Sequence, residues 1–232
     1  MSSEECICHW YEDHRCSGDP EFYQHICQFI TDGLCYAKKL YGEPRVQVRE
    51  VCVVLRPCQD PETVITDRQR GIFTIFISRG RPNGGEYYWF YGQLAHEIAH
   101  LLNAELFDCY VEGLNSVFSR NFCISKSVGW ACWRNRYRSN RGSFYAATYF
   151  MMKDVLEVAG EECISTFLEC AKPTEGSQGR MHIDINQWLK SLPDERKRKS
   201  VKEKIMGHAS SVERARQQNR QAYQFRLPTD DS

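Results

Sequence analysis

The sequence has no excess of charge of either sign. Its 30 basic residues balance 30 acidic ones, and the isoelectric point is about 7.0. Because nucleic acids and anionic membrane surfaces attract strongly basic chains, this balance argues against both partners. The sequence also lacks an apolar run of the roughly 20 residues that a membrane span needs, and no internal repeat is apparent. The 232 residues are therefore expected to form one domain, with or without an appendage.

A secretory signal is also missing from the start of the chain, where residues 1–6 are polar and acidic. The sequence contains 12 cysteines but shows no export route that would oxidise them. We therefore expect reduced thiols and a cytoplasmic location. A disulfide framework is the alternative for the thiols. Delivery into another cell, by a route without a cleaved signal, is the alternative for the location.

Cysteine and histidine are concentrated in the first 27 residues, at Cys6, Cys8, His9, His14, Cys16, His25 and Cys27. These residue types suit a structural zinc ion. Their spacings match no standard arrangement of paired cysteines. A structural zinc site in this stretch is therefore an alternative to ordinary thiols and imidazoles, and it is not our main expectation.

The hydrophobic pattern predicts a mixed α+β chain, since 42% hydrophobic residues exclude a disordered composition. Alternating, β-branched segments predict strands at residues 46–55 and 71–78, with a polar loop at 60–70 between them. Helical spacing predicts helices at residues 21–39, 144–158, 161–170, 183–192 and 194–218. The last is charged and is expected to be a solvated helix, or two, packed by Val201, Ile205 and Met206; a nucleic-acid or partner surface is the alternative. We expect residues 173–179 to be a linker and residues 227–232 to be disordered.

Residues 121–140 are expected to be irregular, and they combine tryptophan with arginine. The residues concerned, here and just beyond, are Trp130, Trp133, Arg134, Arg136, Arg138 and Arg141. One interpretation is a basic, aromatic rim that grips a carboxylate or acidic segment of a substrate. The other is a solvated loop that the two tryptophans hold in place.

The strongest functional signal is the motif His96-Glu97-Ile98-Ala99-His100. On a helix the two histidines are one turn apart and project from one face, which suits a zinc ion. Glu97 lies beside them and is expected to be the general base towards the water that the metal binds. The opposite face of the helix is apolar; it consists of Leu94, Ile98, Leu101 and Leu102. Two core histidines are the alternative, which this opposite apolar face disfavours.

Glu112 is the expected third ligand. Asn103 is a plausible end for the first helix and Asp108 a plausible N-cap for a second helix that runs back antiparallel. His100 lies about one turn before that end and Glu112 about one turn after the restart, so the two would be level. Cys109 and Asp108 stay open as alternative ligands, whereas Glu105 would point away from His100.

These two segments resemble a known family. His96-Glu97-Ile98-Ala99-His100 followed by Tyr110-Val111-Glu112-Gly113-Leu114 resembles the gluzincin metallopeptidases, the thermolysin-like or peptidase MA group. Residues 143–152 and 159–162 look like the helix pair that follows in that group, so the resemblance covers roughly residues 45–172. Ser116 stands where some members have an acidic residue that supports a zinc histidine.

The resemblance implies a zincin-like α+β fold: a small mixed sheet, an active-site helix hairpin and a mostly helical C-terminal lobe. It implies a metallopeptidase domain at 1–172 and leaves 173–232 as a charged helical extension. It implies one zinc ion per chain on His96, His100 and Glu112, with an extended substrate beside the strand at 71–78. A phenol from Tyr145 or Tyr149 would stabilise the oxyanion, although both rings also suit core packing.

The expected function is that of a zinc-dependent endopeptidase with Glu97 as general base. The expected partner is a protein or peptide substrate, with no nucleic acid and no membrane; the oligomeric state is unknown. One alternative is a binding or regulatory protein on a zincin scaffold without useful hydrolysis. Another is a narrow metallo-amidase or deacylase, which a closed pocket in place of an open cleft would indicate.

Overall fold

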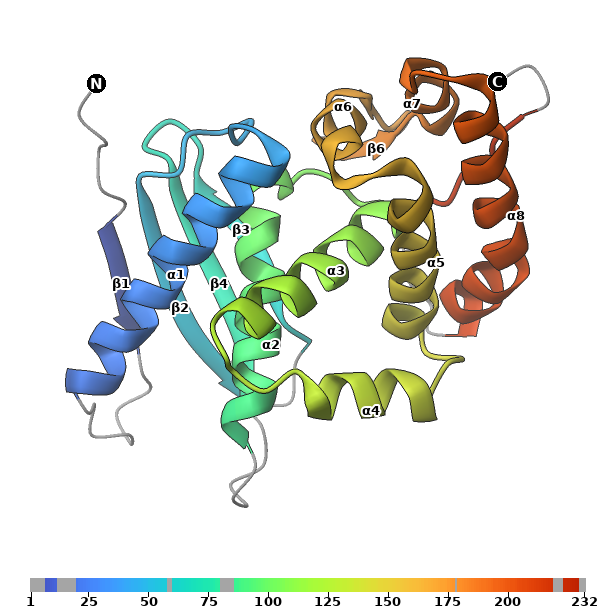
Figure 1. Ribbon diagram of the computed structural model, residues 1–232. Helices are drawn as coiled ribbons and strands as arrows, with labels where there is room; N and C mark the ends of the chain where they lie inside the picture. Colours follow the sequence, from blue (N-terminus) through green and yellow to red (C-terminus); the bar gives the residue numbers. More distant parts are fainter. Residues whose placement is uncertain are drawn as a thin grey trace. The chain divides into compact units, whose positions relative to one another are not determined.

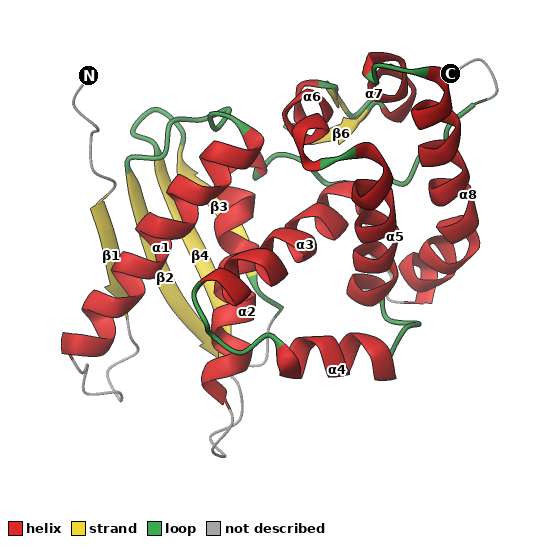
Figure 2. Ribbon diagram, in the orientation of Figure 1, coloured by secondary structure: helices red, strands yellow, loops and turns green. Residues whose placement is uncertain are grey.

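The computed structural model describes residues 7–11, 20–57, 60–79, 86–177, 179–218 and 223–229. Over these residues the chain is mixed α+β, mostly helical with a small sheet (Figures 1 and 2), which confirms the expected class. Two compact units share the chain: residues 1–104 with 118–133, and residues 105–117 with 134–232. The domain boundary expected at residue 172 stays a prediction. Among the described helices, none is both long enough and apolar enough to cross a membrane.

A four-stranded sheet organises the first unit. Its strands are ordered β1 (Ile7–Tyr11), β2 (Glu50–Pro57), β4 (Ile72–Arg79) and β3 (Glu62–Asp67). β1 and β4 both run parallel to β2, whereas β3 is antiparallel to β4. The apolar residues that alternate along β2 and β4 are buried, as expected of strands that present one face to a core; they are Val51, Val53, Phe73, Ile75 and Ile77, and Thr74 between two of them is buried as well.

β3 corrects the prediction of a polar loop at residues 60–70. The run Thr63-Val64-Ile65-Thr66 is β-branched and suits a strand. The polar residues of β3 gave no strand signal in the sequence, because an edge strand needs fewer apolar residues than an interior one. The turn after β3 ends at Gly71, whose φ of +69° is left-handed, so a residue without a Cβ is favoured there.

The position of β3 also changes where an extended substrate could pair. β4 is paired with β2 along its whole length, and residues 72–76 of β4 also pair with β3. Residues 72–76 therefore have no open edge for an extended substrate, which corrects that part of the position expected at residues 71–78. Among the described strands, β3 is the edge of the sheet on this side.

Helices α1 (Pro20–Tyr41) and α2 (Glu86–Asn103) complete the first unit with the later part of α3 (Cys109–Ser125). α1 packs against α2, and α2 packs against β4 and β3. The packing of α1 is close: a Cβ built on Gly33 would lie 3.0 Å from Ile98 Cδ1. The apolar stripe predicted for α2 is buried in full, which confirms that part of the prediction.

The second unit is helical apart from a short hairpin, β5 (Ala171–Pro173) with β6 (Met181–Ile183). Its helices are α5 (Phe144–Ala159), α6 (Ile164–Glu169), α7 (Ile185–Ser191) and α8 (Glu195–Gln218), with a 3₁₀ turn η1 (Glu161–Cys163) before α6. α8 packs along α5. Val201 and Ile205 are buried as expected, but Met206 is 47% exposed, so the expectation that it packs is wrong.

Two further predictions of irregular structure are wrong. Residues 121–140 are largely helical, because α3 continues to Ser125 and α4 spans Ala131–Ser139. The charged composition concealed a helix that buries only Tyr137. Near the C-terminus, residues 227–229 are ordered: Thr229 N donates a 2.9 Å hydrogen bond to Asn186 Oδ1. Residues 230–232 of the predicted disordered tail lie outside the described residues.

Candidate metal centre

α2 places both histidines of the motif on one face. Its residues from Tyr91 to Asn103 form a continuous helix, so His96 and His100 are one turn apart. Their ring centroids are 5.1 Å apart. The side chain of His96 is 9% exposed and that of His100 is half-buried. The pair can therefore offer ring nitrogens to one small ligand.

α3 begins where the sequence indicated. α2 ends at Asn103, and Tyr110 N donates a 2.8 Å hydrogen bond to Asp108 Oδ1, so Asp108 is the N-cap of α3. Both boundaries were predicted, and both are confirmed. This cap fixes the residue at which α3 begins. Glu112 therefore lies at the end of the first turn of the helix.

α3 then runs back along α2. The Ser119 hydroxyl donates a 2.7 Å hydrogen bond to the carbonyl oxygen of Gly92, and Cys123 lies one turn further along α3, beside Tyr91. Later residues of α3 therefore meet earlier residues of α2, as antiparallel helices require. Glu112 lies seven residues before Ser119 on α3, and Ala99 lies seven residues after Gly92 on α2. Seven residues are about two helical turns, so Glu112 is level with Ala99. The predicted level placement of Glu112 and His100 follows from this register.

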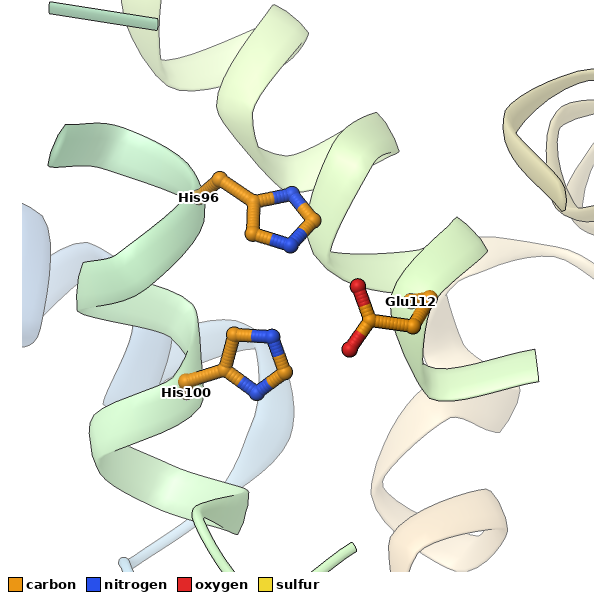
Figure 3. Close-up of side chains that lie close together, drawn as sticks. All are labelled: His96, His100 and Glu112. Carbon is orange, nitrogen blue, oxygen red and sulfur yellow. The ribbon is translucent and has the colours of Figure 1, made fainter. Parts of the chain in front are cut away.

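His96, His100 and Glu112 form a group whose ligand atoms all lie within 4.8 Å of one another. Figure 3 shows the two rings on one helix and the carboxylate on the next, pointing toward each other. His96 and Glu112 are buried. One ion can bridge this spacing, and three donors leave room for a fourth ligand. The residues present therefore fit a catalytic type of metal site better than a closed structural one.

The rival ligands are engaged elsewhere and are not part of this group. The Asp108 carboxylate accepts hydrogen bonds from Tyr110 N and, at 3.0 Å, from Ile183 N. Burial raises the pKa of Asp108 to about 7. Burial also raises the pKa of the Cys109 thiol far above its ordinary value, with Asp108 adding to the effect. A thiol with a raised pKa is a poor source of the thiolate that metals bind, which favours Glu112.

Glu97 faces the sheet. Its side chain is 3% exposed. The hydroxyl of Thr63 on β3 lies 2.9 Å from Glu97 Oε2 and also 2.9 Å from the Glu97 carbonyl oxygen. Sequence reasoning missed Thr63 because it assigned that residue to a loop. The β-branched run around it could have indicated a strand, but not which helix that strand would meet.

The tryptophans of the predicted rim take part in packing. Trp130 is buried, and the ring of Trp133 lies 4.9 Å from that of Trp89, centroid to centroid. Of the arginines named with them, Arg136 is exposed and Arg141 lies over the ring of Phe150. These contacts match the interpretation in which tryptophans hold the segment in place; the basic rim stays a prediction, since Arg134, Arg136 and Arg138 are exposed.

The structure gives the two tyrosine candidates different surroundings. Tyr149 is buried against Tyr137, with ring centroids 5.0 Å apart. Tyr145 is half-buried and packs against Phe144. Neither contact tests the oxyanion role, which stays a prediction.

Tyr137 is a phenol that the sequence reasoning passed over. Burial raises its pKa well above the ordinary value, against a lowering effect of its hydrogen bond with Ser116, and electrostatic interactions with Tyr149 and Glu112 add to the rise. Ser116 therefore bonds to a phenol whose raised pKa keeps it neutral. The i, i+4 spacing of Tyr137 from Trp133 could have signalled a helix there.

The Cys and His cluster of residues 1–27 lies mostly outside the described side chains. The only candidate metal group among the described residues is the one formed by His96, His100 and Glu112. Comparisons with protein families, with curated proteins and with solved structures gave no match. His96, His100 and Glu112 together offer two imidazoles and a carboxylate to an ion. Glu97, the residue after His96 on α2, adds a separate buried carboxylate.

Proposed function

We propose that this chain is a zinc-dependent endopeptidase with a zincin-like fold, similar in design to the gluzincins. The observation that carries the proposal is the convergence of His96, His100 and Glu112 within 4.8 Å, with Glu97 between the two histidines in sequence. Two imidazoles and one carboxylate suit zinc, whereas calcium and magnesium prefer oxygen ligands only. The metal-ion charge would offset the cost of keeping the Glu112 carboxylate buried.

Zinc, when bound, lowers the pKa of water at its open position and polarises the carbonyl of the scissile bond. The side chains supply the rest. His96, His100 and Glu112 hold the ion in place. Glu97 accepts the proton from the attacking water and passes it to the nitrogen of the leaving amine. Its burial keeps bulk water from competing for that proton.

The same donor set also holds iron in some oxygenases. That chemistry requires no general base next to the histidines. Glu97 follows His96 directly and is almost fully buried, with the Thr63 hydroxyl 2.9 Å from its carboxylate. Glu97 therefore favours hydrolysis over oxygen chemistry, and it argues in the same way against a scaffold that only binds.

The edge strand β3 favours a peptide substrate over a small molecule. β3 pairs with β4 on one side and is the last described strand of the sheet. An extended peptide can add to such an edge through backbone hydrogen bonds, whatever its side chains are. Thr63 of this strand contacts Glu97, so the edge runs beside the proposed base.

Mapping of new protein termini by mass spectrometry tests the proposal. Wild type and Glu97→Gln, each loaded with zinc, are incubated with a cell lysate. We expect wild type to create new termini and Glu97→Gln to create on the order of 10²–10⁴-fold fewer, the range for a lost general base. Both proteins should fold and hold one zinc ion per chain, since Glu97 is not a ligand.

The controls separate the alternatives. His96→Ala should lose both metal and cleavage. Equal cleavage by wild type and Glu97→Gln would refute the mechanism. Absence of cleavage by wild type that holds zinc would favour the binding protein, and release of acyl groups or small amines without new protein termini would favour the amidase or deacylase.

A further inference from the structure

The hydroxyl of Thr63 contacts the carboxylate of Glu97. We infer that Thr63 is a positioning residue for this carboxylate, an inference that rests on the proposed function of Glu97 as general base. Thr63 belongs to β3 and Glu97 to α2, 34 residues further along the chain. Both side chains are buried, at 9% and 3% exposure, so water competes little for this contact.

The hydroxyl has two partners on the same residue. It lies 2.9 Å from the Glu97 carbonyl oxygen, which belongs to the rigid backbone of α2, and 2.9 Å from Oε2 at the end of the side chain. The contact to the backbone locates the hydroxyl relative to α2. The contact to Oε2 then locates the carboxylate relative to the same helix.

This arrangement restrains a side chain that is otherwise mobile. Glutamate loses up to about 2 kcal/mol of rotamer freedom when it is held in one conformation. Preorganised groups accelerate a reaction because this ordering has been completed before the substrate arrives.

β3 contains its own matched control. Thr66 is on the same strand, and its hydroxyl pairs with the hydroxyl of Thr74 on β4, 2.6 Å away. Changing Thr63 or Thr66 to valine removes one hydroxyl from the same strand and keeps the β-branched shape. Only the change at Thr63 removes a contact to Glu97, and Thr63→Ser restores the hydroxyl without the methyl group.

Steady-state kinetics on a peptide spanning a mapped cleavage site form the first test. We expect Thr63→Val to lower kcat by about 10- to 100-fold, the effect of a lost hydrogen bond to a charged group. KM and zinc content should stay within twofold of wild type. Thr63→Ser should recover most of kcat, and Thr66→Val should match wild type. A wild-type kcat for Thr63→Val, or a Thr63→Ser no better than Thr63→Val, overturns the inference.

A second test needs neither metal nor activity. In metal-free protein, urea unfolding of wild type, Thr63→Val, Glu97→Met and the double variant forms a double-mutant cycle. We expect the double variant to be less destabilised than the two single effects added together. Additive effects overturn the contact itself. If the cycle shows coupling but zinc-loaded wild type cleaves nothing, the proposed function is overturned. The positioning role of Thr63 in catalysis falls with it, while the contact stands.

Discussion

Trp133 occupies the space where a side chain at position 92 would begin. A Cβ built on Gly92 would lie 1.9 Å from Trp133 Nε1, far inside van der Waals contact. Gly92 lies one helical turn before His96 on α2, so the indole covers the metal-bearing face of the helix just ahead of the first ligand. A glycine in the middle of a helix normally costs stability, and here close packing explains it.

Gly92→Ala is therefore expected to destabilise the protein by about 1–3 kcal/mol, the cost of overpacking. The same change at Gly207 in α8, where an added Cβ meets nothing within 4 Å, should stabilise by up to about 1 kcal/mol. Urea unfolding measures both. In a Trp133→Ala background the penalty of Gly92→Ala should disappear, and a penalty that persists there would contradict this account of the site.

Metal analysis distinguishes the ligands. We expect His96→Ala and Glu112→Ala each to weaken zinc binding by more than about 100-fold, because changes outside the ligand shell alone cost about 10–100-fold. Cys109→Ala should keep the wild-type affinity, because its buried thiol has a raised pKa. Competition with a chromogenic chelator gives the affinities. Full zinc binding by Glu112→Ala, together with loss in Cys109→Ala, would show the ligand set to be wrong.

Asp108 should make stability depend on pH. Burial raises its pKa from 3.8 to about 7 in the folded state. Between these values the folded protein holds one more proton than the unfolded chain, so its contribution to the unfolding free energy falls as pH rises. Above pH 7 the whole cost of the buried charge is present. We expect Asp108→Asn to remove this decline between pH 4.5 and 7.5, measured by urea unfolding of metal-free protein.

Asp184 is the control for that experiment. Burial acts to raise its pKa, but the hydrogen bond from Lys172 and those from backbone groups outweigh burial and hold it below 3.8. It is therefore ionised in both states throughout the same pH range. Asp184→Asn should leave the slope of stability against pH unchanged. An equal slope for wild type and Asp108→Asn would show that Asp108 is not the titrating group.

The C-terminal segment should contribute to the stability of the second unit. Gln224 forms two 2.9 Å backbone hydrogen bonds at the start of α3, one to the carbonyl oxygen of Phe107 and one from the N–H of Cys109. The ring of Tyr223 stacks on Phe144 with centroids 5.1 Å apart. Tyr223→Ala should cost about 1–3 kcal/mol, because a half-buried aromatic ring loses its contacts. Leu227→Ala, at a 40% exposed position, should stay within about 0.5 kcal/mol. Equal effects of the two changes would contradict the docking of this segment.

Local order was largely predictable from the sequence. Helical periodicity predicted α1, α2, α5 and α8, because a long helix must repeat its apolar face every 3.6 residues. The spacing of His96 and His100 placed them on one face, and the Asp108 cap predicted the start of α3. These features depend on residues within a few positions of one another, so their physics is contained in short windows of sequence.

Only the tertiary structure shows which residues from distant parts of the sequence pack against these helices. β3 was missed because its side chains are half polar, and α4 because its buried surface is a single tyrosine. The hydroxyl that holds Glu97 comes from 34 residues away, and the serine that sets the register of α3 on α2 comes from 27 residues beyond Gly92. No local pattern encodes such partners, because the hydroxyl of any serine or threonine can donate to any oxygen that the fold brings near it. Only the packing of β3 and α3 against α2 selects Thr63 and Ser119 from the other hydroxyls of the chain.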